Sequence, residues 1–174
     1  ANTTGYNNTA VGMNALISNT TGKENVAIGV VALDAATTAD RNTAVGYNAL
    51  GANTTGANNT AVGKSALDAN NTAVGHNAMY ASDGASACTA VGYQALRDVT
   101  GNNNTAFGYQ ACRLNTSGVY NVGIGLQALN MNTTGSNNTA VGYQALDAAT
   151  TSSNNTSVGY NSLGANTTGA ENVA

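Results

Sequence analysis

The feature that most constrains this chain is a nine-residue unit that recurs along almost its whole length. The clearest copy runs from Asn138 to Leu146 and reads Asn-Thr-Ala-Val-Gly-Tyr-Gln-Ala-Leu. Ten full copies occur, and their central glycines are Gly12, Gly29, Gly46, Gly63, Gly75, Gly92, Gly108, Gly125, Gly142 and Gly159. These glycines are 17 residues apart at most steps, with one step of 12 and one of 16. A step this short is typical of stacked repeats that pack only on their neighbours.

The residues before each central glycine predict a β-strand. The residue directly before it is Val or Ile in nine of the ten units and Phe107 in the remaining one. Such β-branched side chains prefer extended backbone. The residue two positions earlier is Thr or Val, and the strand period of two places it on the same face. We expect this face, represented by Thr9 and Val11, to be buried. The residue between them, such as Ala10, is always small and should point to the opposite face, close to another group.

The residues after each central glycine predict a second short extended piece that ends in Ala-Leu. The leucine varies only to Met79 and Cys112, so we expect an apolar column with one side chain per coil. The rest of each unit is loop, as in Asn-Thr-Thr-Gly at residues 53–56. The loop glycine suits a turn with positive φ.

The 12-residue step shows how much of each unit the coil needs. Between Leu67 and Asn71 the linker is only Asp68-Ala69-Asn70, and the five-residue Asn-Thr-Thr-Gly-Ala insert is missing. Both neighbouring units keep their pattern. The coil must therefore close in about 12 residues, and the longer units carry a protruding loop.

Together these patterns predict an all-β fold. We expect one repetitive domain over residues 1–174, a parallel β-solenoid or β-roll of about ten coils with 17-residue repeats and one 12-residue coil. With strands about 4.8 Å apart, ten coils would form a rod roughly 50 Å long. A helical fold is the alternative, but its Ala-Leu pieces are interrupted within one turn and are too short to be stable. The chain begins and ends inside a repeat, so we expect a segment of a longer fibre.

Composition narrows the classes of function. The chain is 42% apolar, 5% aromatic and 7% charged, and it contains no proline. A formal net charge of −3 gives no electrostatic reason to expect nucleic-acid binding. No run of about 18 apolar residues exists, so we expect no membrane insertion. Disorder is another interpretation of so much Asn, Thr and Gly, but the apolar positions recur too strictly for it.

The most regular polar position is the first residue of the nine-residue unit. It is Cys88 in one unit and asparagine in the other nine: Asn8, Asn25, Asn42, Asn59, Asn71, Asn104, Asn121, Asn138 and Asn155. Identical amides stacked along a rod can hydrogen-bond from coil to coil. We expect a structural ladder.

The residue after the central glycine is the best candidate for contact with a partner. Its variety indicates an exposed position. It includes five tyrosines and the single histidine, which form a candidate receptor-contact stripe: Tyr47, His76, Tyr93, Tyr109, Tyr143 and Tyr160. Aromatic side chains suit sugars and protein hot spots. Stacked pairs that only stabilise the rod are the alternative interpretation.

Residues for catalysis or metal binding do not form a pattern. His76 is the only histidine, and the eight acidic residues are scattered without a recurring pair. Cys88 and Cys112 match no zinc or redox spacing, which leaves two unpaired thiols or a bridge between neighbouring coils. We therefore expect a protein that is not an enzyme and has no catalytic residue, metal site or cofactor.

Two segments resemble a known family. Residues 25–29, Asn-Val-Ala-Ile-Gly, and 121–125, Asn-Val-Gly-Ile-Gly, resemble the Asn-Ser-Val-Ala-Ile-Gly signature of trimeric autotransporter adhesin heads. The longer Asn-Thr-Ala-Val-Gly-Tyr-Gln-Ala-Leu form resembles repeats of phage and bacterial tail-fibre-like proteins. The resemblance covers nearly the whole chain. It implies a left-handed β-roll, a side-by-side homotrimer, and an extracellular, cell-surface or virion fibre that binds a glycan or protein receptor. This chain departs from the adhesin heads in its longer coils and in using Thr where they prefer Val.

Two classes of function follow. The first is a structural or adhesive fibre segment, a rigid shaft or an attachment head, with the Ala10 column or the Leu16 column at the interface between chains. The second is an ice-binding solenoid that uses its Thr and Asn ladders. Because we expect the Thr9 column to face inward with Val11, the sequence favours the fibre.

Overall fold

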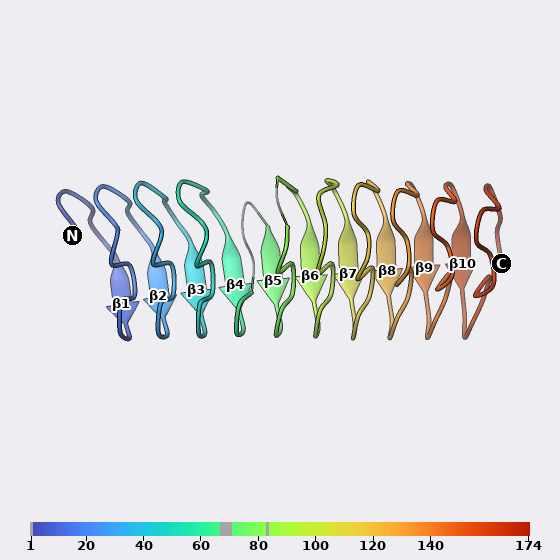
Figure 1. Cartoon of the computed structure of the whole chain (residues 1–174), viewed down its shortest axis with the longest axis horizontal. Coiled ribbons are helices and arrows are strands. Elements are labelled where there is room, and N and C mark those ends of the chain that lie inside the picture. The colour runs from blue at the N-terminus through green and yellow to red at the C-terminus, as the bar shows by residue number, and fades with distance from the viewer. Residues whose placement is uncertain (1, 67–70, 83) are drawn as a thin grey trace.

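The computed structural model describes residues 2–66, 71–82 and 84–174, and they form a rod of stacked coils (Figure 1). These residues contain ten strands and no helix. The strands are β1 (Thr9–Val11), β2 (Val26–Ile28), β3 (Thr43–Val45), β4 (Thr60–Val62), β5 (Thr72–Val74), β6 (Thr89–Val91), β7 (Thr105–Phe107), β8 (Val122–Ile124), β9 (Thr139–Val141) and β10 (Thr156–Val158). They form one sheet in sequence order, and each pairs with its neighbours in parallel. The predicted all-β parallel solenoid is confirmed.

The strand register stacks equivalent residues of successive units. Ala10 of β1 lies opposite Ala27 of β2, and the same match recurs along the sheet. Thr60 of β4 lies opposite Thr72 of β5, twelve residues later in the chain. The coil therefore closes in 12 residues, as predicted from the short step. The linker itself, residues 67–70, lies outside the described residues.

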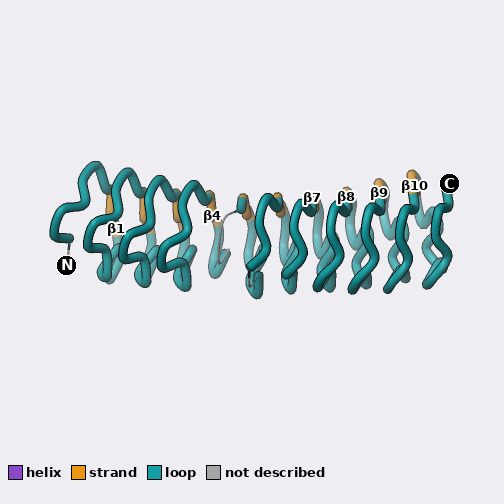
Figure 2. The backbone as a smooth tube through the Cα atoms, turned by 90° about the horizontal axis from the view of Figure 1, so that it is seen from above, coloured by secondary structure: helices purple, strands orange, loops and turns teal. Residues whose placement is uncertain are grey.

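Each coil has two walls of different construction. Figure 2 shows the strands along one side of the rod and turns along the other. The second side, which we call the return wall, runs from the central glycine to the Leu column. In the first coil, the N–H of Ala15 donates to the carbonyl of Gly12, and that of Ile17 donates to Asn14. Asn14 and Leu16 have φ of 61° and 52°. The predicted second extended piece is therefore wrong, because these residues form consecutive turns.

The turns of the return wall stack like the strands do. The N–H of Leu33 donates to the carbonyl of Ala49 in the next coil, and that of Leu50 donates to Ala66. Positive φ is unfavourable for a leucine by about 1–2 kcal/mol. The coil-to-coil hydrogen bonds and the burial of the leucine side chain offset that cost. The predicted apolar column is confirmed.

The interior of the rod contains the small strand residues and the Leu column. From the second coil on, the middle residue of every strand is fully buried: Ala27, Ala44, Ala61, Ala73, Ala90, Ala106, Gly123, Ala140 and Ser157. The Thr and Val positions on either side are half-buried or exposed. The prediction that the Thr9 and Val11 face is buried is therefore wrong. A 12-residue coil leaves a narrow gap between its walls, and the leucines fill most of it, so only a methyl-sized side chain fits from the sheet.

Gly123 illustrates how tight this interior is. A Cβ at Gly123 would lie 2.4 Å from the Sγ of Cys112. Cys112 takes a leucine position in the preceding coil, and its sulfur occupies the space that an alanine methyl fills elsewhere. The two departures from the repeat therefore compensate each other.

The same burial corrects the expected interface between chains. Ala27 and Leu33 have no exposed surface in a single chain, and the other described members of both columns beyond the first coil are similarly enclosed, apart from the half-buried Leu163. Leu67 lies outside the described residues. Leu16 itself is buried and only Ala10, in the first coil, is exposed. Neither column is available to a second chain, because both pack in the interior of their own coil.

The loop glycines also differ from expectation. Gly22 does not adopt positive φ, and a Cβ there would lie 2.3 Å from the carbonyl oxygen of Ala39 in the next coil. Positive φ occurs two residues later, at Glu24. The loop glycine is needed for close stacking and not for a left-handed turn.

The placement of the two strand faces leads to a direct test in β3. Ala44→Val adds two methyl groups to the enclosed face and should lower the free energy of unfolding by about 1–3 kcal/mol. Val45→Ala removes the same groups from the outward face and should cost less than about 1 kcal/mol. Urea unfolding followed by far-ultraviolet circular dichroism, at two protein concentrations to separate folding from assembly, measures both. A larger loss for Val45→Ala would contradict the orientation.

Candidate functional site: strand face and aromatic edge

The outward side of the sheet, which we call the strand face, consists of the Thr and Val columns of β1–β10. The strands are built only from Thr, Val, Ala, Ile, Gly, Ser and Phe, so this face carries no charge. Large apolar side chains are exposed along its length, including Val11 at 57%, Phe107 at 41% and Val158 at 59%. No strand threonine uses its hydroxyl in a hydrogen bond within the described part of the chain. The face therefore presents two adjacent columns, one mostly of threonine hydroxyls and methyls and one mostly of valine methyls.

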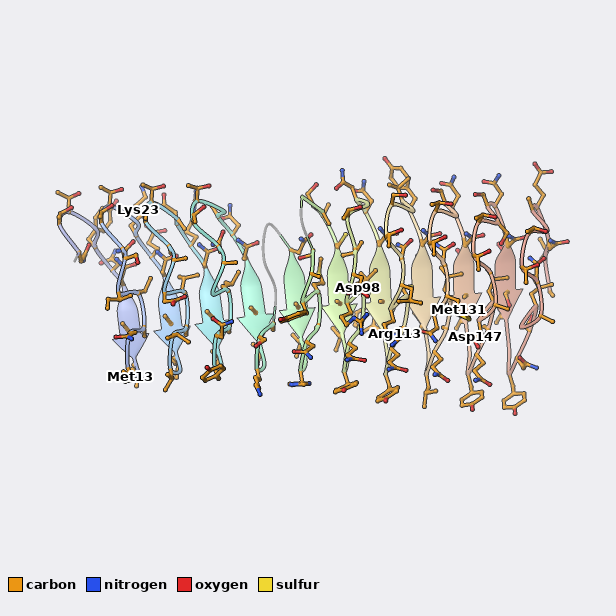
Figure 3. The ribbon with its side chains drawn as sticks, viewed as in Figure 1. Met13, Lys23, Asp98, Arg113, Met131 and Asp147 are labelled. Atoms are coloured by element: carbon orange, nitrogen blue, oxygen red, sulfur yellow. The ribbon has the colours of Figure 1, made fainter. Side chains whose placement is uncertain are left out.

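The aromatic edge is the column of residues directly after the central glycines. Figure 3 shows it as the lower edge of the rod, where Met13 is labelled, opposite the loop edge that carries Lys23. Its members are exposed: Met13, Val30, Tyr47, Lys64, His76, Tyr93, Tyr109, Leu126, Tyr143 and Tyr160. Tyr160 is 80% exposed. The structure thus places all six residues of the candidate stripe on one edge.

Most rings of this edge stack on one another. His76 stacks on Tyr93 with centroids 5.4 Å apart, and Tyr93 stacks on Tyr109 at 5.1 Å. Tyr143 and Tyr160 form a second stack at 5.2 Å. Tyr47 stands apart, with the Nζ of Lys64 5.9 Å from its ring centroid. Ring faces inside a stack are occupied by the neighbouring ring, so a partner would meet ring edges and phenol hydroxyls there. Both interpretations of the stripe, stabilisation and contact, are compatible with this geometry.

A row of amides accompanies the aromatic edge. The Nε2 of Gln110 donates to the Oε1 of Gln94 at 2.9 Å, and Gln127 and Gln144 continue the row at 3.3 and 3.1 Å. The sequence analysis did not predict these hydrogen bonds. The pattern that could have indicated them is the recurrence of Gln at one position in four successive units.

The asparagines at the start of each unit stack along the axis. The Oδ1 of Asn25 accepts the backbone N–H of Asn42 at 2.9 Å and its side-chain N–H at 3.1 Å. The side-chain amide of Asn42 also donates to the carbonyl of Gly56 in the loop of the next coil. All but the half-buried Asn8 are buried. Each amide thus satisfies buried backbone groups of two coils, and the column offers no surface to a ligand.

Cys88 interrupts this ladder. Its backbone N–H donates to the Oδ1 of Asn71, and its Sγ accepts the backbone N–H of Asn104 at 3.4 Å. Cys88 and Cys112 are free and buried, so no bridge joins them. Burial raises the pKa of the Cys88 thiol, and it raises the pKa of Cys112 to about 12. Both thiols are therefore protonated and unreactive at neutral pH.

A few charged side chains lie directly after the Leu column. Figure 3 labels Asp98, Arg113 and Asp147 between the two edges of the rod. Asp98 forms an ion pair with Arg97 in the same coil, and its Oδ1 accepts from the Arg97 Nε at 2.9 Å. Burial raises the pKa of Asp147. Among the described residues, no three His, Cys, Asp or Glu side chains are grouped as a metal site would require. The same residues include no helix able to span a membrane.

No protein-family model, curated protein or solved structure matches this chain significantly.

Proposed function

We propose that the chain is a segment of a structural or adhesive fibre that assembles side by side as a homotrimer through its strand face. The observation that carries the proposal is the uncharged strand face, whose apolar side chains are exposed along ten coils. Contiguous apolar surface of this kind marks interaction sites. The aromatic edge and the loops then remain outside and contact a glycan or protein receptor. We place the fibre outside the cell, on a cell surface or virion, with left-handed coils, as its resemblance to adhesin heads and tail fibres implies.

The lack of charge also indicates the kind of neighbour that the strand face accepts. A charged partner surface would lose its hydration against these methyl groups without gaining a counter-charge. A second copy of the same face brings no such cost, and its threonine hydroxyls can pair across the interface. The rod thus gains an apolar interior between chains in addition to the narrow one inside each coil.

One pair of variants tests the assembly. Sedimentation equilibrium should give three times the chain mass of 17.2 kDa for the unaltered protein. Val91→Asp places one carboxylate per chain in the interface and should yield folded monomers. Tyr93→Asp, two residues further along the same coil, lies on the aromatic edge and should leave the trimer intact. A monomeric unaltered protein, or equal behaviour of the two variants, would overturn the proposal.

Ice binding is the second candidate, and the outward Thr column favours it. The strand threonines were predicted to face inward, but they face outward and are half-buried or exposed. Against it, Val26 and Val122 interrupt the Thr column, and Phe107 projects from a face that a rigid ice lattice needs to be flat. Thermal hysteresis at micromolar protein, measured on the same sample as the mass, separates the two functions. Hysteresis from a monomer would establish ice binding and exclude the fibre assembly.

A further inference from the structure

The strand face is uniform except at three levels, where a level is the height of one strand along the rod. Most levels present Thr and Val. The β2 level presents Val26 and Ile28, and the β8 level presents Val122 and Ile124. The β7 level presents Thr105 with Phe107, the only phenylalanine of the chain. These side chains point outward: Ile28, Phe107 and Ile124 are each about two-fifths exposed.

Packing inside one chain covers these three levels only in part. The enclosed core of small middle residues and the Leu column does not include the outward positions. Their neighbours within the chain are the same-face residues of adjacent strands: Phe107 lies opposite Ile124, and Ile28 lies opposite Val45. Beside these neighbours about two-fifths of each of the three side chains stays exposed, and in a lone rod that apolar surface faces water. A surface that covers the face would bury this remainder.

We infer that Val26 and Ile28, Phe107, and Val122 and Ile124 set the polarity and register in which copies of this chain assemble. The inference rests on the proposed function, because it takes the second copy as the occupant of the strand face. In a parallel, in-register assembly each exceptional level meets its own copy. The Val and Ile levels then pack on apolar groups, and the Phe107 rings share one level.

Other alignments leave mismatches. A slip of one coil places Phe107 against the level of Val91 or Ile124, where a ring meets a face with no room for it and wedges the chains apart. The same slip sets Val26 and Val122 against threonines, whose buried hydroxyls lose water without a partner.

Phe107 excludes the most competitive alternative. An antiparallel pair can place β2 opposite β8 in both directions, which matches the two Val and Ile levels. That alignment sets β7 opposite β3, so that Phe107 faces Val45. In the parallel assembly Phe107 meets its own copy, and in the antiparallel one it meets Val45. Phe107 therefore distinguishes the two assemblies.

Distance measurement between spin labels tests the inference. Met13→Cys places a label on the exposed aromatic edge at the first level, and the two native thiols are buried. The labelled protein should give one narrow distance. Antiparallel pairing of β1 with β9 separates two such labels by eight coil steps, roughly 38 Å along the rod.

Three variants carry the test. Phe107→Val should add a population at the longer distance, and the uniform face made by V26T, I28V, F107V, V122T and I124V together should broaden the distribution further. Leu126→Val changes a residue of the aromatic edge and none of the strand face, and it should leave the narrow distance unchanged. An assembled uniform-face variant with the same narrow distance as the unaltered protein would overturn this inference while the proposed fibre stands. A monomeric unaltered protein would overturn the proposed function itself.

Discussion

Replacing Gly142 by alanine should destabilise the rod by about 4 kcal/mol or more. Gly142 has φ of 138°, which L residues rarely adopt. A Cβ there would also lie 2.3 Å from the carbonyl oxygen of Gly159 in the next coil. Since every central glycine except Gly159 stacks in this way, the clash can be relieved only by separating two coils. Separation would break coil-to-coil hydrogen bonds on both walls. The measurement is the free energy of unfolding from urea titration.

The chain offers matched controls for this effect. Gly159 has φ of 134°, but a Cβ there meets nothing closer than 3.9 Å. Gly159→Ala should therefore cost only the backbone strain, about 1–3 kcal/mol. Gly12 is also near an end of the rod, and its Cβ would lie 2.4 Å from the carbonyl oxygen of Gly29. Gly12→Ala should lower the free energy of unfolding by more than Gly159→Ala does. Because both glycines lie near an end of the rod, this difference reports the clash and not fraying of the ends. Equal losses for all three variants would show that conformation alone requires glycine.

Asn121→Ala should lower the free energy of unfolding by about 2–5 kcal/mol, because it leaves the buried backbone N–H of Asn138 without a partner and removes two further hydrogen bonds. The carbonyl of Gly135 keeps its bond from the side-chain amide of Asn132. The Oδ1 of Asn121 accepts the backbone N–H of Asn138 at 3.0 Å and its side-chain N–H at 3.2 Å. Its Nδ2 donates to the carbonyl of Gly135 at 2.8 Å. Alanine keeps the backbone N–H that bonds to Asn104 but removes all three of these contacts.

The natural exception in the ladder supplies the comparison. Cys88 stands at the equivalent position, and its Sγ lies 3.4 Å from the backbone nitrogen of Asn104 and 3.5 Å from the carbonyl oxygen of Gly101. The sulfur thus replaces, in part, the amide as hydrogen-bond partner of these two backbone groups. Asn121→Cys should therefore cost less than Asn121→Ala under the same urea titration. If Asn121→Ala unfolds within about 0.5 kcal/mol of the unaltered protein, the ladder contributes nothing to stability.

Repetition made the rod and its axial contacts predictable. A fixed step aligns each residue with its counterpart in the next unit, so the parallel register, the 12-residue coil and the Leu column follow from the spacing alone. The Asn column was placed by the same reasoning, and the candidate stripe was placed on one exposed edge. Local sequence did not predict the return wall. Leucine disfavours positive φ, and only the hydrogen bonds between coils and the burial of its side chain make that conformation favourable there.

By itself, the sequence determined that Thr9 and Val11 share a face and that Ala10 points to the other, because alternation follows from the geometry of a strand. It did not determine which face is inside. That choice belongs to the distance between the two walls, which the turns of the return wall and the width of Leu33 and its counterparts set. Hydrophobicity would place the valines inside, but the enclosed gap admits only a methyl group. The tertiary structure therefore turned the valines and threonines outward and made the strand face the surface on which a role for this protein is now proposed.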